Sequence, residues 1–257
     1  MKKLLILILV FVSTSIKAQE KQLTLDEKIY GLSLIWQEVN YNFAYLERYK
    51  YDWDSVYMAN IPKVIAAKNI TEYYAVLSQI INSFHEGHTT VVLPLEVKKM
   101  YGYVPISLSY INSKYYVTAF SSEYKDKISI GSVLIKVNAY DVDDYYNKFV
   151  FPNNNLAEHI AKRQVGKGAF FAGLLSEGLE ATFLNPNDIT VSLKLKHHSY
   201  FSDAPETIKV PKMYKDTAFL RKKYGDISYI RIKSFLNDVP STSFAKIVDS
   251  LKNSKAI

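Results

Sequence analysis

The stretch TEYYAVLSQIINSFHEGHTTV, residues 71–91, marks a change of pattern along this chain. Its first part places apolar side chains at helical spacing and predicts a helix capped at Thr71. The side chains expected on the inward face are Tyr74, Leu77, Ile80, Ile81 and Phe84. Its last part is β-branched and favours strand. The stretch therefore predicts a helical region followed by a β-rich region, which is an α+β fold.

Two more helical patterns precede this stretch. Residues 24–45 open with a capping box made by Thr24 and Glu27 and repeat apolar side chains at helical spacing. Residues 52–69 form a second pattern that contains Pro62, which is expected to kink or restart the helix. Residues 19–98 are therefore predicted to be an N-terminal helical bundle.

Strand and turn patterns follow. Residues 104–121 alternate around a polar Asn-Ser-Lys turn, and residues 131–149 give a short strand, a turn at Asn138 and a helix from about Asp141. Residues 155–178 are expected to be largely helical, with a break near residues 166–168. Two strands are then expected at residues 188–197 and 206–213. Residues 99–218 are thus predicted to be a β-rich module with a helical insertion.

The last segment, residues 219–257, is predicted to hold a strand and then a helix. The strand pattern covers 225–235 and the helix pattern 241–257, where Ala256 and Ile257 look like the start of another strand. A strand and its crossover helix normally lead into a second parallel strand. We therefore expect this segment either to pack on the rest of the chain or to belong to an incomplete protein.

The N-terminus has the pattern of a secretory signal peptide. Residues 1–18 combine a basic start, an apolar run from Leu4 to Val12 and a polar end closing with Ala18. The run is shorter than the roughly 20 residues that a transmembrane helix needs, and no later stretch comes near that length. We expect no membrane span and an exported protein, periplasmic or extracellular.

Composition excludes several classes of protein. With 48% hydrophobic residues in 257, the chain can bury a core, and without cysteine it can form neither disulfides nor thiolate zinc sites. The formal charge of +7 falls to +4 when the three lysines of residues 1–18 are left out. The remaining basic residues are scattered, whereas phosphate binding requires a clustered stripe. Nucleic acid is therefore not expected as a partner.

Three segments, taken in order, resemble the tail-specific (C-terminal processing) serine peptidases of the tricorn-like subgroup: residues 53–94, 131–142 and 225–235. EGHT, residues 86–89, is similar to the family's Asp-Gly-His-Thr motif. A PDZ-like signature follows at Gly131, Leu134, Val137, Asn138 and Ala139. The resemblance implies a helical domain, a PDZ-like module and the start of an α/β peptidase core. It also implies hydrolysis of proteins or peptides near their C-termini through an acyl-enzyme, without metal or organic cofactor.

The sequence departs from the family pattern at two places. Ala139 replaces a glycine that suits a positive backbone angle, so the turn is expected to differ locally. The chain also ends at NSKAI, residues 253–257, before the family's glycine-rich turn and the segment with its serine nucleophile and supporting acid. We therefore expect an inactive, truncated peptidase or, if the natural protein stops here, a remnant that binds peptide C-termini.

His88 is the predicted catalytic base. A serine peptidase needs a neutral imidazole that takes the hydroxyl proton and returns it to the leaving amine. Thr89 or Glu86 is a candidate to orient the ring. The alternative is that His88 only caps the helix or bonds a backbone carbonyl.

A metal site is not predicted. His85 and His88 are three residues apart, whereas the metalloprotease pattern needs four-residue spacing, and Gly87 suggests that the helix ends between them. His197 and His198 alternate along a strand and so point to opposite faces. His159 is expected at the surface of a helix.

No serine has the sequence setting of a nucleophile, since Ser234, Ser241 and Ser243 follow a strand or begin a helix, where capping explains them. Peptide binding is the second candidate function, because PDZ-like folds add a peptide as an extra strand and hold its terminal carboxylate with backbone amides. The groove is predicted near residues 101–108. Tyr103, Val104 and Ile106 are its expected lining residues, or alternatively core residues of a strand.

Overall fold

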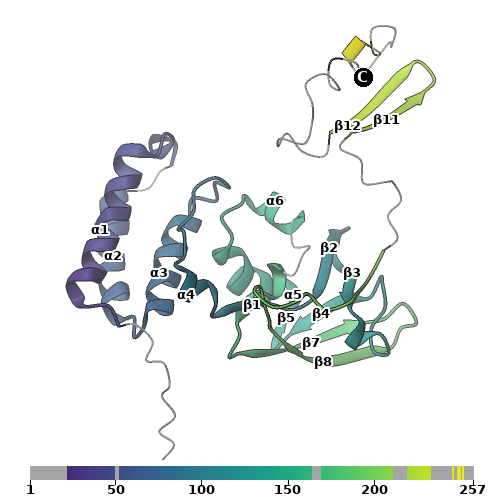
Figure 1. The fold of residues 1–257 in the computed structure, drawn as a ribbon, viewed down its shortest axis with the longest axis horizontal. Coiled ribbons are helices and arrows are strands. Elements are labelled where there is room, and N and C mark those ends of the chain that lie inside the picture. The colour runs from purple at the N-terminus through teal and green to yellow at the C-terminus, as the bar shows by residue number, and fades with distance from the viewer. Residues whose placement is uncertain are drawn as a thin grey trace, which may run out of the picture. The chain divides into compact units, whose positions relative to one another are not determined.

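The computed structural model of this chain describes residues 22–49, 52–163, 169–210, 219–232, 245, 248–249 and 251. The chain divides into two compact units, residues 1–209 and 210–257, which are described separately (Figure 1). The predicted signal segment lies outside the described residues. So do Ser234, Ser241 and Ser243 and the expected break at 166–168.

The first unit begins with helices. They are α1 (Leu25–Asn42), the 3-10 turn η1 (Leu46–Arg48), α2 (Trp53–Ala66), α3 (Ile70–Asn82) and α4 (Leu95–Lys98). The predicted capping box of α1 is confirmed, because Thr24 and Glu27 each accept a hydrogen bond from the other's backbone amide. Of the kink or restart predicted at Pro62, the restart is wrong, since α2 runs through that residue. The predicted cap of α3 is also wrong, because Asn69 accepts from the amide of Glu72 at 2.8 Å and Thr71 lies inside the helix.

Helices α1, α2 and α3 share one apolar core. Phe84, just after α3, is its central aromatic ring and lies 4.8–5.3 Å, centroid to centroid, from the rings of Phe43, Tyr49 and Trp53. The predicted inward face of α3 is confirmed at Leu77, Ile80 and Ile81, which are all buried. At its start the buried tyrosine is Tyr73 rather than Tyr74, and the Tyr73 hydroxyl donates to the carbonyl of Lys28 at 3.2 Å.

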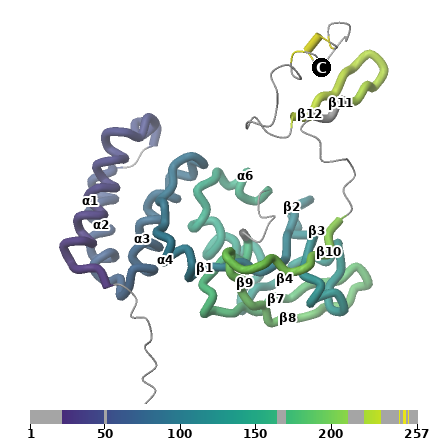
Figure 2. The backbone as a smooth tube through the Cα atoms, in the orientation of Figure 1, coloured from purple at the N-terminus to yellow at the C-terminus, as the bar shows by residue number. Residues whose placement is uncertain are grey.

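The second half of this unit is an antiparallel sheet in the order β10-β3-β4-β7-β8, with β2 paired to β3 and β5 paired to β4 (Figure 2). The strands are β2 (Ile106–Ile111), β3 (Lys114–Ser121), β4 (Val133–Val137), β5 (Tyr140–Asp141), β7 (Gly178–Leu184), β8 (Thr190–Lys196) and β10 (Thr207–Lys209). Three short strands, β1 (Tyr101–Tyr103), β6 (Gly173–Leu174) and β9 (His198–Ser199), form a second small sheet. Together with the helices, this makes an α+β fold.

Helical turns connect the strands. They are the 3-10 turn η2 (Ser122–Tyr124), helix α5 (Val142–Tyr145), the π-helical turn η3 (Tyr146–Val150), η4 (Phe151–Asn153), α6 (Glu158–Arg163) and η5 (Ala169–Phe171). The stretch 155–178 was predicted to be largely helical, and its described residues are helical only in α6 and η5, with its end entering β6 and β7. The strand β7 was not predicted, although its Leu179, Ala181 and Phe183 alternate as buried residues.

Both predicted turns of the sheet are present. Asn112 and Ser113 join β2 to β3 with positive φ values of 48° and 59°. Asn138 takes the positive φ, 52°, between β4 and β5, and Ala139 does not adopt one. Replacing glycine at residue 139 therefore costs this turn no backbone strain.

The second unit contains a hairpin of β11 (Phe219–Tyr224) and β12 (Ile227–Ile232), joined through Gly225 with a φ of 59°. The predicted strand corresponds to β12, whereas β11 was not predicted. Of the predicted terminal helix, the structure describes helical conformation at Ala245, Val248 and Asp249. No helix in the described parts of the chain is long and apolar enough to cross a bilayer.

Candidate functional site

The predicted base lies in a loop after α3, not in the last turn of the helix. The helix ends at Asn82, where the Ser83 hydroxyl donates to the carbonyl of Ile80 at 2.7 Å. His85 then adopts a positive φ of 47°, which directs the chain away from the helix axis. The predicted break at Gly87 is therefore wrong by several residues.

His85 and His88 have different partners. The ring of His85 stacks on Phe151 with centroids 4.2 Å apart and planes 8° from parallel. Its Nδ1 lies 3.2 Å from the carbonyl oxygen of Asn154. The two histidines consequently do not form a metal pair, and the described residues contain no group of three or more His, Cys, Asp or Glu that could hold a metal ion.

Within the described part of the chain, the His88 side chain contacts Glu86 and otherwise faces solvent. Its Nδ1 lies 2.9 Å from Oε1 of Glu86, and its side chain is 95% exposed. A carboxylate only accepts hydrogen bonds, so this contact assigns the ring proton to Nδ1 and leaves the lone pair of Nε2 open. That is the arrangement that a general base requires.

Glu86 organises the loop as an acceptor of three hydrogen bonds. Besides the His88 ring, the His88 amide and the Thr89 hydroxyl donate to its Oε2 at 3.1 and 2.8 Å. The hydrogen bond from the His88 ring, followed by that from Thr89, holds the pKa of the Glu86 carboxyl below its ordinary value of 4.5. Glu86 is therefore an anion at neutral pH and orients His88, while Thr89 orients Glu86.

A residue of the β-rich half fixes the same loop. Asn155 Nδ2 donates to the carbonyl oxygens of Gly87 and Thr89, each at 3.3 Å. A Cβ on Gly87 would lie 2.7 Å from Leu156 Cδ2, so a larger residue here would require the Leu156 side chain to move. The sequence carries no local signal for Asn155, because it is 68 residues from Gly87.

Of the three residues predicted to line the groove, two are buried in the core. Val104 and Ile106 are 0% exposed in the core under the sheet. The Ile106 amide donates to the carbonyl of Val104 at 2.7 Å and so is already engaged. These two residues do not line an open groove, and the alternative, that they are core strand residues, describes them correctly. Tyr103 is half-buried and stacks on Tyr200 at 5.2 Å, centroid to centroid.

The other histidines belong to the scaffold. His197 lies between two carbonyl oxygens, with Nδ1 2.8 Å from Glu177 and Nε2 3.0 Å from Phe171. His198 faces Glu123 instead, with its Nε2 3.4 Å from Oε1 of that residue. His159 is exposed on α6, as predicted.

Comparison with known proteins identifies the fold. Mature CPAF matches with a TM-score of 0.57 at 14% identity, over 90% of this chain and 54% of CPAF. Mature CPAF complexed with lactacystin matches with a TM-score of 0.58 at 15% identity, over 88% of this chain and 53% of that chain. A photosystem II D1 C-terminal processing protease also matches, over 87% of this chain and 58% of that one, but its TM-score of 0.32 at 9% identity is too low to support an argument.

The sequence itself has no recognised match, since neither a family model nor a curated protein corresponds to it. The chain spans about half the length of the CPAF chains that it resembles. The described residues therefore share an α+β fold with mature CPAF, and they present an imidazole oriented by a carboxylate on a loop that both halves of the first unit hold in place.

Proposed function

We propose that this chain supplies the base-carrying part of an exported serine peptidase of the tail-specific family, which cleaves proteins or peptides near their C-termini. His88 is the general base: its Nε2 takes the proton of a serine hydroxyl and returns it to the leaving amine. Glu86 accepts from Nδ1 and stabilises the imidazolium that forms in between.

One observation carries this proposal. The 2.9 Å contact between His88 Nδ1 and Glu86 is combined with a His88 side chain that is 95% exposed. A histidine that only capped a helix or bonded a backbone carbonyl would have no need for a carboxylate partner that two further hydrogen bonds hold in place. The fold similarity to CPAF supports the same family of peptidases.

We further propose that the chain alone does not hydrolyse peptides. Within the described residues, the only hydrogen bonds of the His88 side chain go to Glu86, and no serine hydroxyl is in contact with it. An acyl-enzyme forms only where a serine hydroxyl lies within hydrogen-bond reach of the base.

The test compares hydrolysis by the complete natural protein with hydrolysis by this chain. In the complete protein, His88→Gln should lower kcat by roughly 10²- to 10⁴-fold, with a smaller change in KM, because it removes proton transfer only. His159→Gln, on an exposed histidine outside the loop, is the matched control. An unchanged kcat in the His88 variant would overturn the assignment of His88 as the base. Rapid hydrolysis by the 257-residue chain alone would overturn the proposal that this chain is inactive by itself.

A second candidate function is peptide binding without catalysis, and the helix beside strand β2 favours it. Strand β2 pairs with β3 in the described residues, and a PDZ-like module binds a peptide by adding it as a strand to such a sheet. Helix α6 lies beside this strand, with Lys162 Nζ 5.8 Å from the ring centre of Tyr110. A PDZ-like module would bind a peptide in this position.

Labelled peptides that differ only at the C-terminus distinguish the two functions. A PDZ-like module should bind a peptide with a free carboxylate more tightly than its amidated counterpart. Equal binding of both would remove the tail-specific part of the proposal, and no binding of either would remove the binding function altogether.

A further inference from the structure

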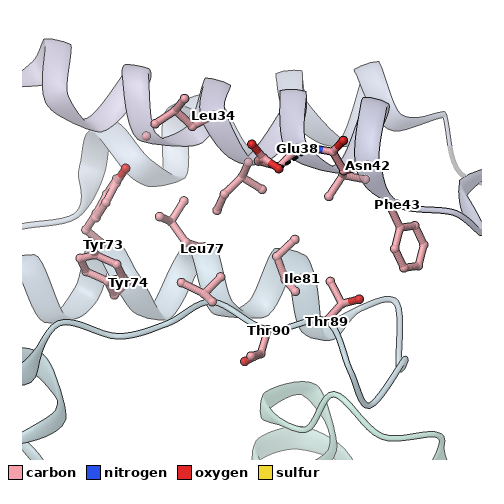
Figure 3. A pocket seen from close by; sticks show the side chains of 14 residues that line it. Leu34, Glu38, Asn42, Phe43, Tyr73, Tyr74, Leu77, Ile81, Thr89 and Thr90 are labelled. Atoms are coloured by element: carbon pink, nitrogen blue, oxygen red, sulfur yellow. Dashed lines mark hydrogen bonds between the residues drawn. The ribbon is translucent and has the colours of Figure 1, made fainter.

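The helical region contains a pocket of about 480 Å³ between α1 and α3, open on one side (Figure 3). The loop segment just after His88 also lines it, through Thr89, Thr90 and Val91. The pocket therefore adjoins the candidate active-site loop and lies within one unit of the chain.

The pocket has the size and walls of a small-molecule site. Such sites range from roughly 300 to 1,000 Å³ and are lined mainly by apolar side chains. Here Leu77 and Ile81 of α3 point towards the facing helix, while Tyr73 and Phe43 lie at opposite ends (Figure 3). An apolar body of modest length would fit between the helices.

The charge of the pocket lining indicates which polar group a ligand would need. Among the described residues that line the pocket, only Glu38 carries a charge. Its Oε2 accepts a hydrogen bond from Asn42 Nδ2 at 2.6 Å, which holds the carboxylate on the α1 side of the opening. A carboxylate at this place attracts a cation and disfavours an anion.

Thr89 connects the pocket to the candidate base. This residue lines the pocket, and its hydroxyl donates to Glu86 Oε2 at 2.8 Å. Glu86 in turn accepts from His88 Nδ1. A ligand that touches Thr89 is therefore separated from the His88 ring by two hydrogen bonds.

We propose that this pocket binds a small amphiphile with an apolar body and a protonated amine, and that its occupation changes the environment of His88. The amine pairs with Glu38 and the body lies between α1 and α3. The proposal is independent of the peptidase assignment, because it needs neither a serine nor hydrolysis.

Three probes of equal length test the proposal: hexylamine, 1-hexanol and hexanoate, titrated into the 257-residue chain and followed by NMR. Hexylamine should give saturable shifts at the backbone amides of Leu77 and Thr89 and at the His88 ring. Because Glu38 is exposed, we expect 1-hexanol to bind about fivefold more weakly, and hexanoate more weakly still. In Glu38→Gln, hexylamine should lose its advantage over 1-hexanol.

A matched pair of variants tests the location. Leu34 is 41% exposed at the pocket and Leu25, on the same helix, is 56% exposed outside it. Leu34→Trp should weaken hexylamine binding about tenfold by filling the opening, and Leu25→Trp should leave it within about twofold. The proposed site would be contradicted if hexylamine binding did not saturate, or if hexanoate bound as tightly as hexylamine. It would also be contradicted if the two tryptophan substitutions had equal effects. Binding without a shift of the His88 ring would overturn the coupling.

Discussion

The two sites predicted from the sequence, the His88 loop and the segment around Tyr103, differ in the structure. The His88 loop is polar and exposed, and its polar groups bond one another and Asn155. In the second segment, Val104 and Ile106 are fully buried. The comparison teaches that a polar cluster at a helix end can hold a reactive group in solvent, whereas apolar residues at a strand start are taken into the core.

The largest expected effect tests the buried side of this comparison. Ile106→Ala removes a side chain with 0% exposure and should lower the free energy of unfolding by about 2–5 kcal/mol, measured by urea denaturation. Ile111 lies on the same strand and is 52% exposed, so Ile111→Ala should change it by no more than about 0.5 kcal/mol. If both variants lost similarly little free energy of unfolding, the prediction that Ile106 lines a groove would be supported instead.

The next effect tests how the loop is held. Asn155→Ala removes the donor to the carbonyls of Gly87 and Thr89 and should destabilise the loop by about 1–2 kcal/mol. Hydrogen exchange of the amides of residues 86–90 should accelerate accordingly. Asn40→Ala, on the exposed side of α1, is the control. Unchanged hydrogen exchange in the Asn155 variant would show that the loop does not depend on the hydrogen bonds from Asn155.

A smaller effect concerns pH. The folded-state pKa of Glu86 lies below 4.5, so the contribution of its carboxylate is present above that pH and is lost as the pH falls through the lower, folded-state pKa. Because His88 is exposed, we expect this to amount to at most about 1 kcal/mol. The Thr89 amide shift should move in this acid range, and Glu86→Gln should abolish the movement. If the Thr89 amide shift still changed over this acid range in the Glu86→Gln variant, another group would be responsible for the change.

The smallest effect concerns two tyrosines under the sheet. The hydroxyls of Tyr115 and Tyr146 are buried and find no hydrogen-bond partner within the described residues. Tyr146→Phe should therefore be neutral or stabilise the protein by up to about 1 kcal/mol. By contrast, Tyr73→Phe loses the bond to the Lys28 carbonyl and should destabilise the protein by about 1 kcal/mol in the same denaturation measurement. Equal losses in both variants would show that the Tyr146 hydroxyl is paired.

Local patterns predicted part of the local structure. The capping box of α1, the inward face of α3 and the turn at Asn112 and Ser113 each depend on neighbours within a few residues. Other local predictions failed, because the cap of α3 is Asn69 rather than Thr71 and the helix ends at Asn82, before Gly87. Two strands were also not predicted. The strand β7 is defined by its pairing with β4 and β8, and β11 by its pairing with β12.

The candidate site, too, could be predicted only in part. His88 and its two neighbours were identifiable because Glu86, His88 and Thr89 lie within four residues of one another. The role of Asn155 was not, since a contact across 68 residues leaves no spacing to recognise. Burial of Ile106 was equally hidden, because strand patterns do not say which apolar positions a sheet covers.

The tautomer of His88 tests the central claim most directly. Long-range ¹H–¹⁵N NMR of the imidazole rings, at a pH where His88 is neutral, distinguishes a proton on Nδ1 from one on Nε2. The contact of 2.9 Å with Glu86 requires the proton on Nδ1, with Nε2 free to accept, and Glu86→Gln should shift the tautomer balance. A neutral ring protonated at Nε2 in the unmodified chain would contradict the assignment of His88 as a base oriented by Glu86.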